Sequence, residues 1–141
     1  MAPYPLMLLT AAFMLAPAIG GCSQQKYDVD TRPPATAGHA EIVLTADKTG
    51  NGQLSMELEH LPPPQQIDPS LQYYVVWATA DGRDPYKLGV LDYDAKDRTG
   101  KLDATFSDDR LTLIVTLEKD ATVSAPLGAR VLEQVVIAPR R

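Results

Sequence analysis

The clearest pattern in the chain is an alternation of apolar and polar residues with a period of two. Residues 53–59 read Gln-Leu-Ser-Met-Glu-Leu-Glu, and in residues 111–118 alternate leucine and valine positions lie opposite Thr116 and Glu118. A period of two places successive side chains on opposite faces of an extended chain, so each segment is expected to be a β-strand with one face toward a core. Comparable segments lie at 40–45, 72–79, 86–93, 101–106 and 131–138. The pattern predicts about seven short strands.

Turn-forming residues separate these segments. Residues 47–52 read Asp-Lys-Thr-Gly-Asn-Gly, and Asn-Gly is the strongest short signal for a hairpin. The prolines at 62–64 end the next strand, because proline cannot donate to a strand ladder. We therefore predict an all-β, immunoglobulin-like antiparallel β-sandwich over residues 39–139, without the paired cysteines of antibody domains. A small β-barrel is the alternative architecture.

The most apolar strand contains the only tryptophan, Trp77. Both faces of residues 72–79 are largely apolar, which is typical of a strand in the interior of a sheet. We expect Trp77 to be the packing centre of the sandwich rather than a ligand-stacking residue, because it lies within an apolar run. On the partner strand, Gly89 predicts a bulge or close contact with a large neighbour such as Trp77.

The first 21 residues have a different pattern. An uncharged segment holds an apolar core from Leu6 to Ala16, which suits a signal peptide and is shorter than the ~20 apolar residues of a membrane span. It ends in Ile19-Gly20-Gly21-Cys22, which resembles a bacterial lipobox, where cleavage precedes a cysteine that receives acyl chains such as palmitate. It lacks the Lys or Arg with which signal peptides usually start. An uncleaved anchor, or a plain secretory signal followed by an incidental cysteine, is the alternative.

Three regions follow from these patterns: a lipoprotein signal peptide at 1–21, a lipidated cysteine and flexible tether at 22–38, and the sandwich domain at 39–139. The tether is predicted because residues 23–38 are polar, contain two adjacent prolines and show no strand or helix period. We expect Cys22 to anchor the protein to a membrane of the bacterial cell envelope, facing the periplasm or the exterior. Ser23, in place of an aspartate, favours the outer membrane over the inner one.

Charge and composition argue against several kinds of function. The net charge is −5, so the clustered Lys and Arg of a nucleic-acid-binding surface are not expected. One cysteine cannot form an internal disulfide, and two distant histidines leave too few ligands for a Cys/His zinc site. His60 is expected to be a hydrogen-bonded residue at a strand end, on the apolar face of that strand, since no catalytic partner is marked by spacing. Cys22 is thus the one site residue predicted, with no catalytic, metal-binding or cofactor-binding residue.

Two acidic segments require separate consideration as calcium sites. Residues 47–52 and the segment with Asp92, Asp94 and Asp97 supply carboxylates, but each has fewer oxygen ligands than a calcium loop, and Lys96 and Arg98 offset the charge of the second. We predict solvated turns at both places.

Four short motifs, in order, resemble the extracytoplasmic C-terminal domain of anti-sigma-K factors. They are Tyr74-Val75-Val76-Trp77, Leu88-Gly89-Val90-Leu91, Leu113-Ile114-Val115-Thr116-Leu117-Glu118 and Ala125-Pro126-Leu127-Gly128. The similarity covers residues 72–138 and implies a β-sandwich outside the cytoplasmic membrane. It implies no binding of a sigma factor, because in the family that activity belongs to a cytoplasmic helical domain joined to a membrane span. It also supplies no catalytic residue.

The leading hypothesis is a non-enzymatic, lipid-anchored envelope protein whose immunoglobulin-like domain has an interaction or sensing role, with an envelope protein as partner. A calcium- or carbohydrate-binding envelope module is the alternative, and the two acidic segments are its candidate sites. An enzyme is the third hypothesis, for which the sequence identifies no small-molecule substrate and no pair of titratable groups.

Overall fold

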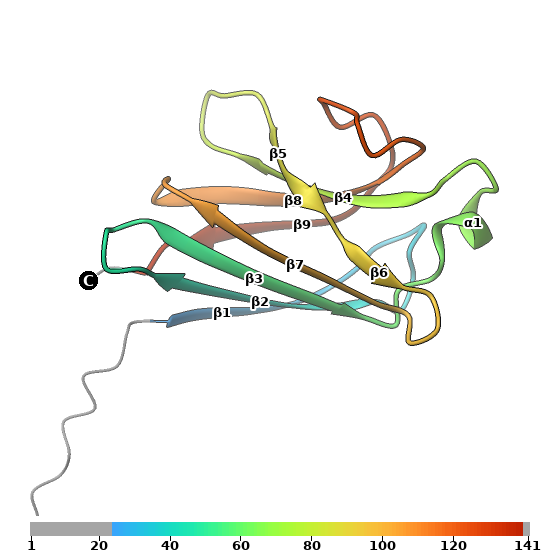
Figure 1. The fold of residues 1–141 in the computed structure, drawn as a ribbon, viewed down its shortest axis with the longest axis horizontal. Coiled ribbons are helices and arrows are strands. Elements are labelled where there is room, and N and C mark those ends of the chain that lie inside the picture. Colours follow the sequence, from blue (N-terminus) through green and yellow to red (C-terminus); the bar gives the residue numbers. More distant parts are fainter. Residues whose placement is uncertain (1–23, 140–141) are drawn as a thin grey trace, which may run out of the picture.

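The computed structural model describes residues 24–139, which form a sandwich of two antiparallel β-sheets (Figure 1). Sheet A has the strand order β1-β2-β3-β7-β6, and sheet B has the order β5-β4-β8-β9. The strands are β1 (Gln24–Asp30), β2 (His39–Ala46), β3 (Gly52–Glu59), β4 (Tyr73–Thr79), β5 (Tyr86–Val90), β6 (Asp92–Asp94), β7 (Thr99–Phe106), β8 (Arg110–Glu118) and β9 (Arg130–Ile137). A short helix, α1 (Pro64–Ile67), lies between β3 and β4. The predicted all-β sandwich is confirmed, with nine strands in the described residues where about seven were expected.

The strand order is that of an immunoglobulin-like domain. If β2 to β9 are taken as strands A, B, C, C′, D, E, F and G, sheet A contains A-B-E-D and sheet B contains C′-C-F-G. The chain passes from sheet B to sheet A between β5 and β6, at the buried Leu91. β1 is an additional strand that precedes strand A and forms the edge of sheet A.

β1 occupies part of the segment for which a flexible tether was predicted. Gln24–Asp30 pairs with β2 along its whole length, from Gln24 opposite Thr45 to Asp30 opposite His39. The prediction of a tether over 22–38, with a domain that begins at residue 39, was wrong for these residues. Only Tyr27 and Val29 of β1 pack against the core, so the hydrophobic signal of this strand is weak. Its charged side chains are typical of a protected sheet edge. The predicted signal peptide at 1–21 and Cys22 lie outside the described residues.

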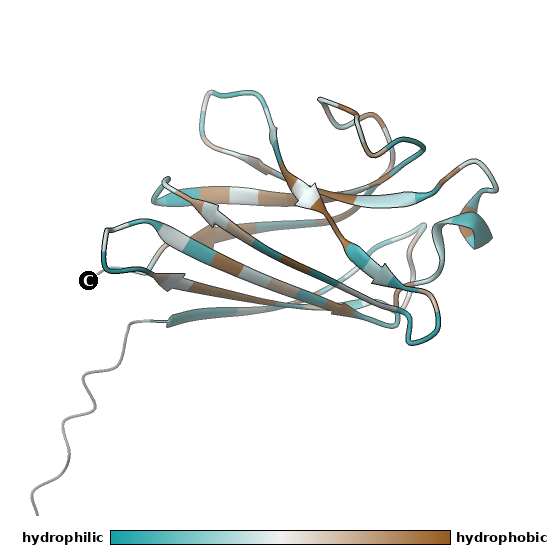
Figure 2. Cartoon of the chain, in the orientation of Figure 1, coloured by the Kyte–Doolittle hydropathy of each residue, from teal (hydrophilic) through white to brown (hydrophobic). Residues whose placement is uncertain are grey.

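The main core lies between the two sheets and is built from alternate residues of the strands. In Figure 2 these positions appear as apolar bands that alternate with more polar ones along β3 and β8. Its buried members include Ile42, Leu44, Leu54, Met56, Leu58, Tyr74, Val76, Leu111, Leu113, Val115, Leu117 and Val136. The predicted inward faces of residues 54–58 and 111–117 are therefore confirmed.

Gly89 marks a bulge, as predicted, but its neighbour is not Trp77. The register between β4 and β5 shifts at Val76 and Trp77, beside Gly89. A Cβ atom at Gly89 would lie 2.8 Å from a methyl carbon of Leu102 in sheet A. The glycine therefore permits close approach of the two sheets, rather than contact with the tryptophan.

The two ends of the sandwich carry different segments. The start of β1, the 47–51 turn, the 80–85 loop and the end of β9 lie at one end, which we call the Gln24 end (Figure 1). The connections at 31–38, 60–72 and 119–129 lie at the opposite end, which we call the far end. Among residues 24–139, no helix has the length and apolar character needed to cross a membrane.

Candidate functional site

Trp77 lies on the outer face of sheet B and is completely buried there. Its neighbours along β4, Tyr74, Val76 and Ala78, face the core between the sheets. Trp77 instead belongs to a separate outer cluster with Val75 and Ile114, against which Tyr73, Val90 and Val123 pack. The prediction that Trp77 is buried was right, but its prediction as the packing centre of the sandwich was wrong. The 119–129 loop, which contains Val123, adds a second layer over this sheet, so both faces of β4 are buried.

A chain of buried hydrogen bonds leads from Trp77 to this loop. The Nε1–H group of Trp77 donates to Thr116 Oγ1 at 2.9 Å, and the Thr116 hydroxyl donates to Glu118 Oε2 at 2.6 Å. The Glu118 carboxylate also accepts the backbone N–H groups of Leu127 at 3.3 Å and Gly128 at 3.1 Å. Thr116 is 0% exposed and Glu118 is 2% exposed. We call this chain the Trp77–Thr116–Glu118 relay, and it fastens the loop backbone to β8.

Glycine is required at position 128 by close approach of the loop to β8. A Cβ atom at Gly128 would lie 1.6 Å from the backbone oxygen of Leu117. The Leu117 N–H group donates to Ala129 O at 3.0 Å in the same place. The loop and the end of β8 are thus in direct backbone contact.

Lys87 of β5 holds the other part of the loop. Its Nζ atom donates to Ala121 O at 2.7 Å and lies 5.7 Å from the ring centroid of Trp77. An ammonium group over an indole face is electrostatically favourable. The loop is therefore attached near both of its ends, at Ala121 and at Gly128.

The surface of the loop presents an apolar side chain. Leu127 is 80% exposed, more than any other large hydrophobic side chain in the described part of the chain, and Ala125 and Ala129 beside it are also exposed. Residues 121–129 carry no charged side chain. The backbone N–H group of Leu127 is bound to Glu118, so this exposed side chain extends from a fixed backbone.

The neighbouring 60–72 segment is held by two tyrosines. The Tyr74 hydroxyl donates to Pro62 O, and the Tyr93 hydroxyl donates to Leu61 O at 2.6 Å. Burial raises the pKa of both phenols above the usual value, so both hydroxyl groups remain protonated donors. Each of the two long far-end connections is therefore anchored by polar side chains of the sheets.

Two of the far-end connections, residues 60–72 and 119–129, lie beside each other. The backbone N–H group of Gln72, at the end of one, donates to Glu118 O at 3.0 Å, at the start of the other. Lys119 also helps to lower the pKa of Asp68, after the larger effect of hydrogen bonds from Ser70. Residues 60–72 and 119–129 thus form one continuous surface, which we call the far-end surface. It is the candidate interaction site.

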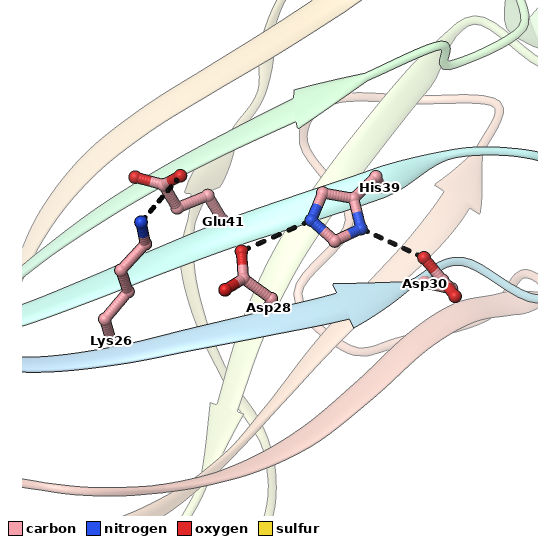
Figure 3. A network of polar contacts seen from close by, with 5 residues as sticks. All are labelled: Lys26, Asp28, Asp30, His39 and Glu41. Atoms are coloured by element: carbon pink, nitrogen blue, oxygen red, sulfur yellow. Dashed lines mark hydrogen bonds and ion pairs between the residues drawn. The ribbon is translucent and has the colours of Figure 1, made fainter.

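The outer face of sheet A has a different character. It carries an acidic face, which consists of Asp28, Asp30, Glu41, Glu57 and Glu59. On this face His39 Nδ1 lies 2.9 Å from Asp30 Oδ1, and Nε2 lies 3.3 Å from Asp28 Oδ1 (Figure 3). The hydrogen bond with Asp30, followed by that with Asp28, raises the pKa of His39.

Lys26 forms a further ion pair of this face, with Nζ 3.3 Å from Glu41 Oε2 (Figure 3). Together with the His39 contacts, it links β1 to β2. Within residues 24–139, no group of three or more His, Cys, Asp or Glu side chains is arranged to hold a metal ion. The His39 contacts could not be expected from the sequence, because they depend on the pairing of β1 with β2.

Residues 47–51 form a turn, as predicted, whereas Asp92 and Asp94 of the second acidic segment lie in the short strand β6 and only residues 95–98 form a turn. Asp47 Oδ1 accepts the N–H groups of Thr49 and Asn51, each at 2.9 Å. Asp94 Oδ1 accepts the N–H group of Lys96, also at 2.9 Å. These carboxylates stabilise the turns that follow them, in the manner of Asx turns.

His60 departs from its predicted position. It has a φ angle of 55°, is exposed, and does not continue the apolar face of β3. Its side chain makes no hydrogen bond with any residue in the 24–139 region. The chain bends at this residue, and the buried Leu61 takes the next position toward the core.

Comparison of the chain with models of protein families, with curated proteins and with solved structures found no match.

Proposed function

We propose that this protein is a non-enzymatic interaction or sensing domain of the bacterial cell envelope, anchored by lipid at Cys22, which binds an envelope protein through its far-end surface. The observation that carries the proposal is the position of residues 60–72 and 119–129. In the immunoglobulin-like strand order they are the B–C and F–G connections. In antibody variable domains the corresponding loops are part of the binding surface. This is an analogy of fold, and the geometry of the surface itself supports it.

The state of the far-end connections supports a binding role. Both are fastened by side chains of the sheets, through the Trp77–Thr116–Glu118 relay and through Tyr74 and Tyr93. A loop that is already ordered loses less conformational entropy when it binds. Leu127 on this surface supplies an exposed apolar group that a partner could bury.

The anchoring part of the proposal is supported by sequence. Cys22 follows Ile19-Gly20-Gly21 at the end of an apolar segment, and it is the one cysteine of the chain. The resemblance of residues 72–138 to the extracytoplasmic domain of anti-sigma-K factors also favours a position outside the cytoplasmic membrane. Outer-membrane sorting is favoured by Ser23.

Lipidation is tested by expression of the full chain and of Cys22→Ala in a bacterial host. We expect the unmodified sequence to give a mature protein that starts at Cys22, carries the mass of added acyl chains and sediments with membranes. Cys22→Ala should remain unprocessed or become soluble. A mature mass without acyl chains would refute the anchor.

Partner binding is tested with a photo-crosslinking amino acid in living cells. The crosslinker is placed at Leu127 on the far-end surface or, as a control, at Ser55 on the exposed outer face of sheet A. We expect Leu127 to give one discrete protein adduct that Ser55 does not give, and mass spectrometry then identifies it. Identical adducts from both positions, or none from Leu127, would contradict the proposed surface.

A further inference from the structure

We infer that β1 sets the orientation of the sandwich on the membrane, so that the Gln24 end lies against the lipid surface and the far-end surface points away from it. This inference rests on the proposed lipidation of Cys22. The partner of the Gln24 end is then a lipid bilayer.

Only a short distance separates the anchor from the fold. Cys22 precedes Gln24 by two positions, and Gln24 is already paired with Thr45 of β2. Two residues of extended chain span at most about 7 Å. A flexible tether over residues 22–38 would instead have a root-mean-square reach on the order of 20 Å and would let the domain turn freely. Pairing of β1 therefore leaves the lipid attachment close to one end of the sandwich.

The direction of β1 decides which end of the sandwich lies near the anchor. Strand β2 begins at His39, which lies opposite Glu59 at the far end, where the 60–72 connection starts. A chain anchored directly ahead of β2 would bring the far-end surface to the bilayer. β1 runs antiparallel to β2 and returns the chain to the opposite end. Its seven residues correspond to about 23 Å of strand.

β1 is attached to both sheets. The Tyr27 hydroxyl accepts the backbone N–H group of Ile137, at the edge of sheet B, at 2.9 Å. The Lys26 and His39 contacts described above tie the same strand to β2 within sheet A. β1 is therefore a fixed part of the sandwich, so the position of the anchor determines the orientation of the whole domain.

The described turns and loops of the Gln24 end are acidic overall. In these turns and loops the acidic residues outnumber the basic ones: Asp47, Asp81, Asp84, Asp108 and Asp109 against Lys48 and Arg83. Attraction of these turns and loops to anionic lipid is therefore not the cause of the orientation. The covalent reach of the anchor sets the orientation, so the orientation should be insensitive to salt.

The orientation can be measured by fluorescence quenching on reconstituted protein. Lys48→Cys and Leu127→Cys each introduce one free thiol, because the single natural cysteine is acylated. The full lipoprotein is purified from membranes, labelled with bimane and incorporated into phosphatidylethanolamine–phosphatidylglycerol vesicles that contain head-group spin-labelled lipid. We expect quenching of the Lys48 label to be at least about threefold stronger than quenching of the Leu127 label, at low and at high salt. Equal quenching, or stronger quenching at Leu127, overturns the orientation.

A matched control separates the role of β1 from that of the anchor. Insertion of about twelve Gly and Ser residues between Ser23 and Gln24 gives the anchor a reach on the order of 20 Å and should bring the two labels to similar quenching. An unchanged ratio contradicts the inference. The mass of the purified protein gives an independent result: without acyl chains the proposed anchor fails, whereas acylated protein with equal quenching refutes the orientation alone.

Discussion

The outer faces of the two sheets differ in what covers them. On sheet A the outer face is open, and it carries the acidic face with His39 and Lys26. On sheet B the 119–129 loop covers Val75, Trp77 and Ile114, and the polar groups beneath it are paired in the Trp77–Thr116–Glu118 relay. The outward-facing residues of β1 to β3 are therefore largely polar, and those beneath the loop are apolar or internally paired, while Val135 and Ile137 of β9 are apolar residues of sheet B that remain exposed. The comparison predicts that substitutions on the two faces have very different effects.

The largest effect is expected from Trp77→Ala. It removes the largest side chain of the covered face and the donor to Thr116, and we expect the free energy of unfolding to fall by about 3–5 kcal/mol. Chemical denaturation of the purified protein in the Cys22→Ala background provides the measurement. Trp77→Phe, which keeps an aromatic ring and loses the N–H group, should lose less. A loss below about 1 kcal/mol for Trp77→Ala would show that the outer cluster does not contribute to stability.

A somewhat smaller effect is expected from Glu118→Ala. The change leaves the Thr116 hydroxyl and the N–H groups of Leu127 and Gly128 without their acceptor, which should cost about 2–4 kcal/mol. Glu118→Gln retains one acceptor oxygen and should cost less. Denaturation of both variants gives the ranking, and a reversed order would contradict the relay.

On sheet A, Glu57→Gln should change the free energy of unfolding by no more than about 0.5 kcal/mol. Glu57 is exposed, and Lys101 Nζ is 3.8 Å from its carboxylate. The same denaturation measurement applies. A loss comparable to that of Glu118→Gln would remove the distinction between the two faces.

The smallest effect concerns pH and His39. Because its hydrogen bonds with Asp30 and Asp28 raise the pKa of His39 above 6.5, protonated His39 favours the folded state. Its contribution is fully present below about pH 6.5 and is lost as the pH rises through the pKa of the folded protein. We expect hydrogen exchange of β1 to accelerate between pH 6 and 8.5, after correction for intrinsic exchange, in the natural sequence but not in His39→Gln. The same acceleration in both proteins would assign the effect to another group.

Most strands could be predicted from the sequence because their apolar residues alternate. β1 could not, since its core-facing residues are only Tyr27 and Val29 and the rest of the strand is polar. Hydrophobic periodicity detects strands by what they bury, and a polar edge strand buries little. The domain therefore begins at β1, ahead of the boundary at residue 39 that the periodicity predicts.

The burial of Trp77 could be predicted, but the face on which it is buried could not. Two apolar faces on β4 show that both are covered, without showing whether a sheet or a loop covers each one. Thr116 and Glu118 occupy positions that look solvent-exposed in a strand of period two. A signal was present in Trp77 itself, because a buried indole N–H group needs an acceptor, and that acceptor proved to be Thr116.

The covered face of sheet B holds the 119–129 loop in one conformation, and in the proposed function this order prepares the loop for a partner. Hydrogen exchange of the Gly128 amide, which donates to Glu118, measures this directly. In the natural sequence we expect exchange to be slowed by on the order of 100-fold relative to an unstructured chain, with most of that protection lost in Glu118→Ala. If the Gly128 amide instead exchanged as fast as an unstructured chain in the natural sequence, the relay would not hold the loop, and the ordered binding surface would be refuted.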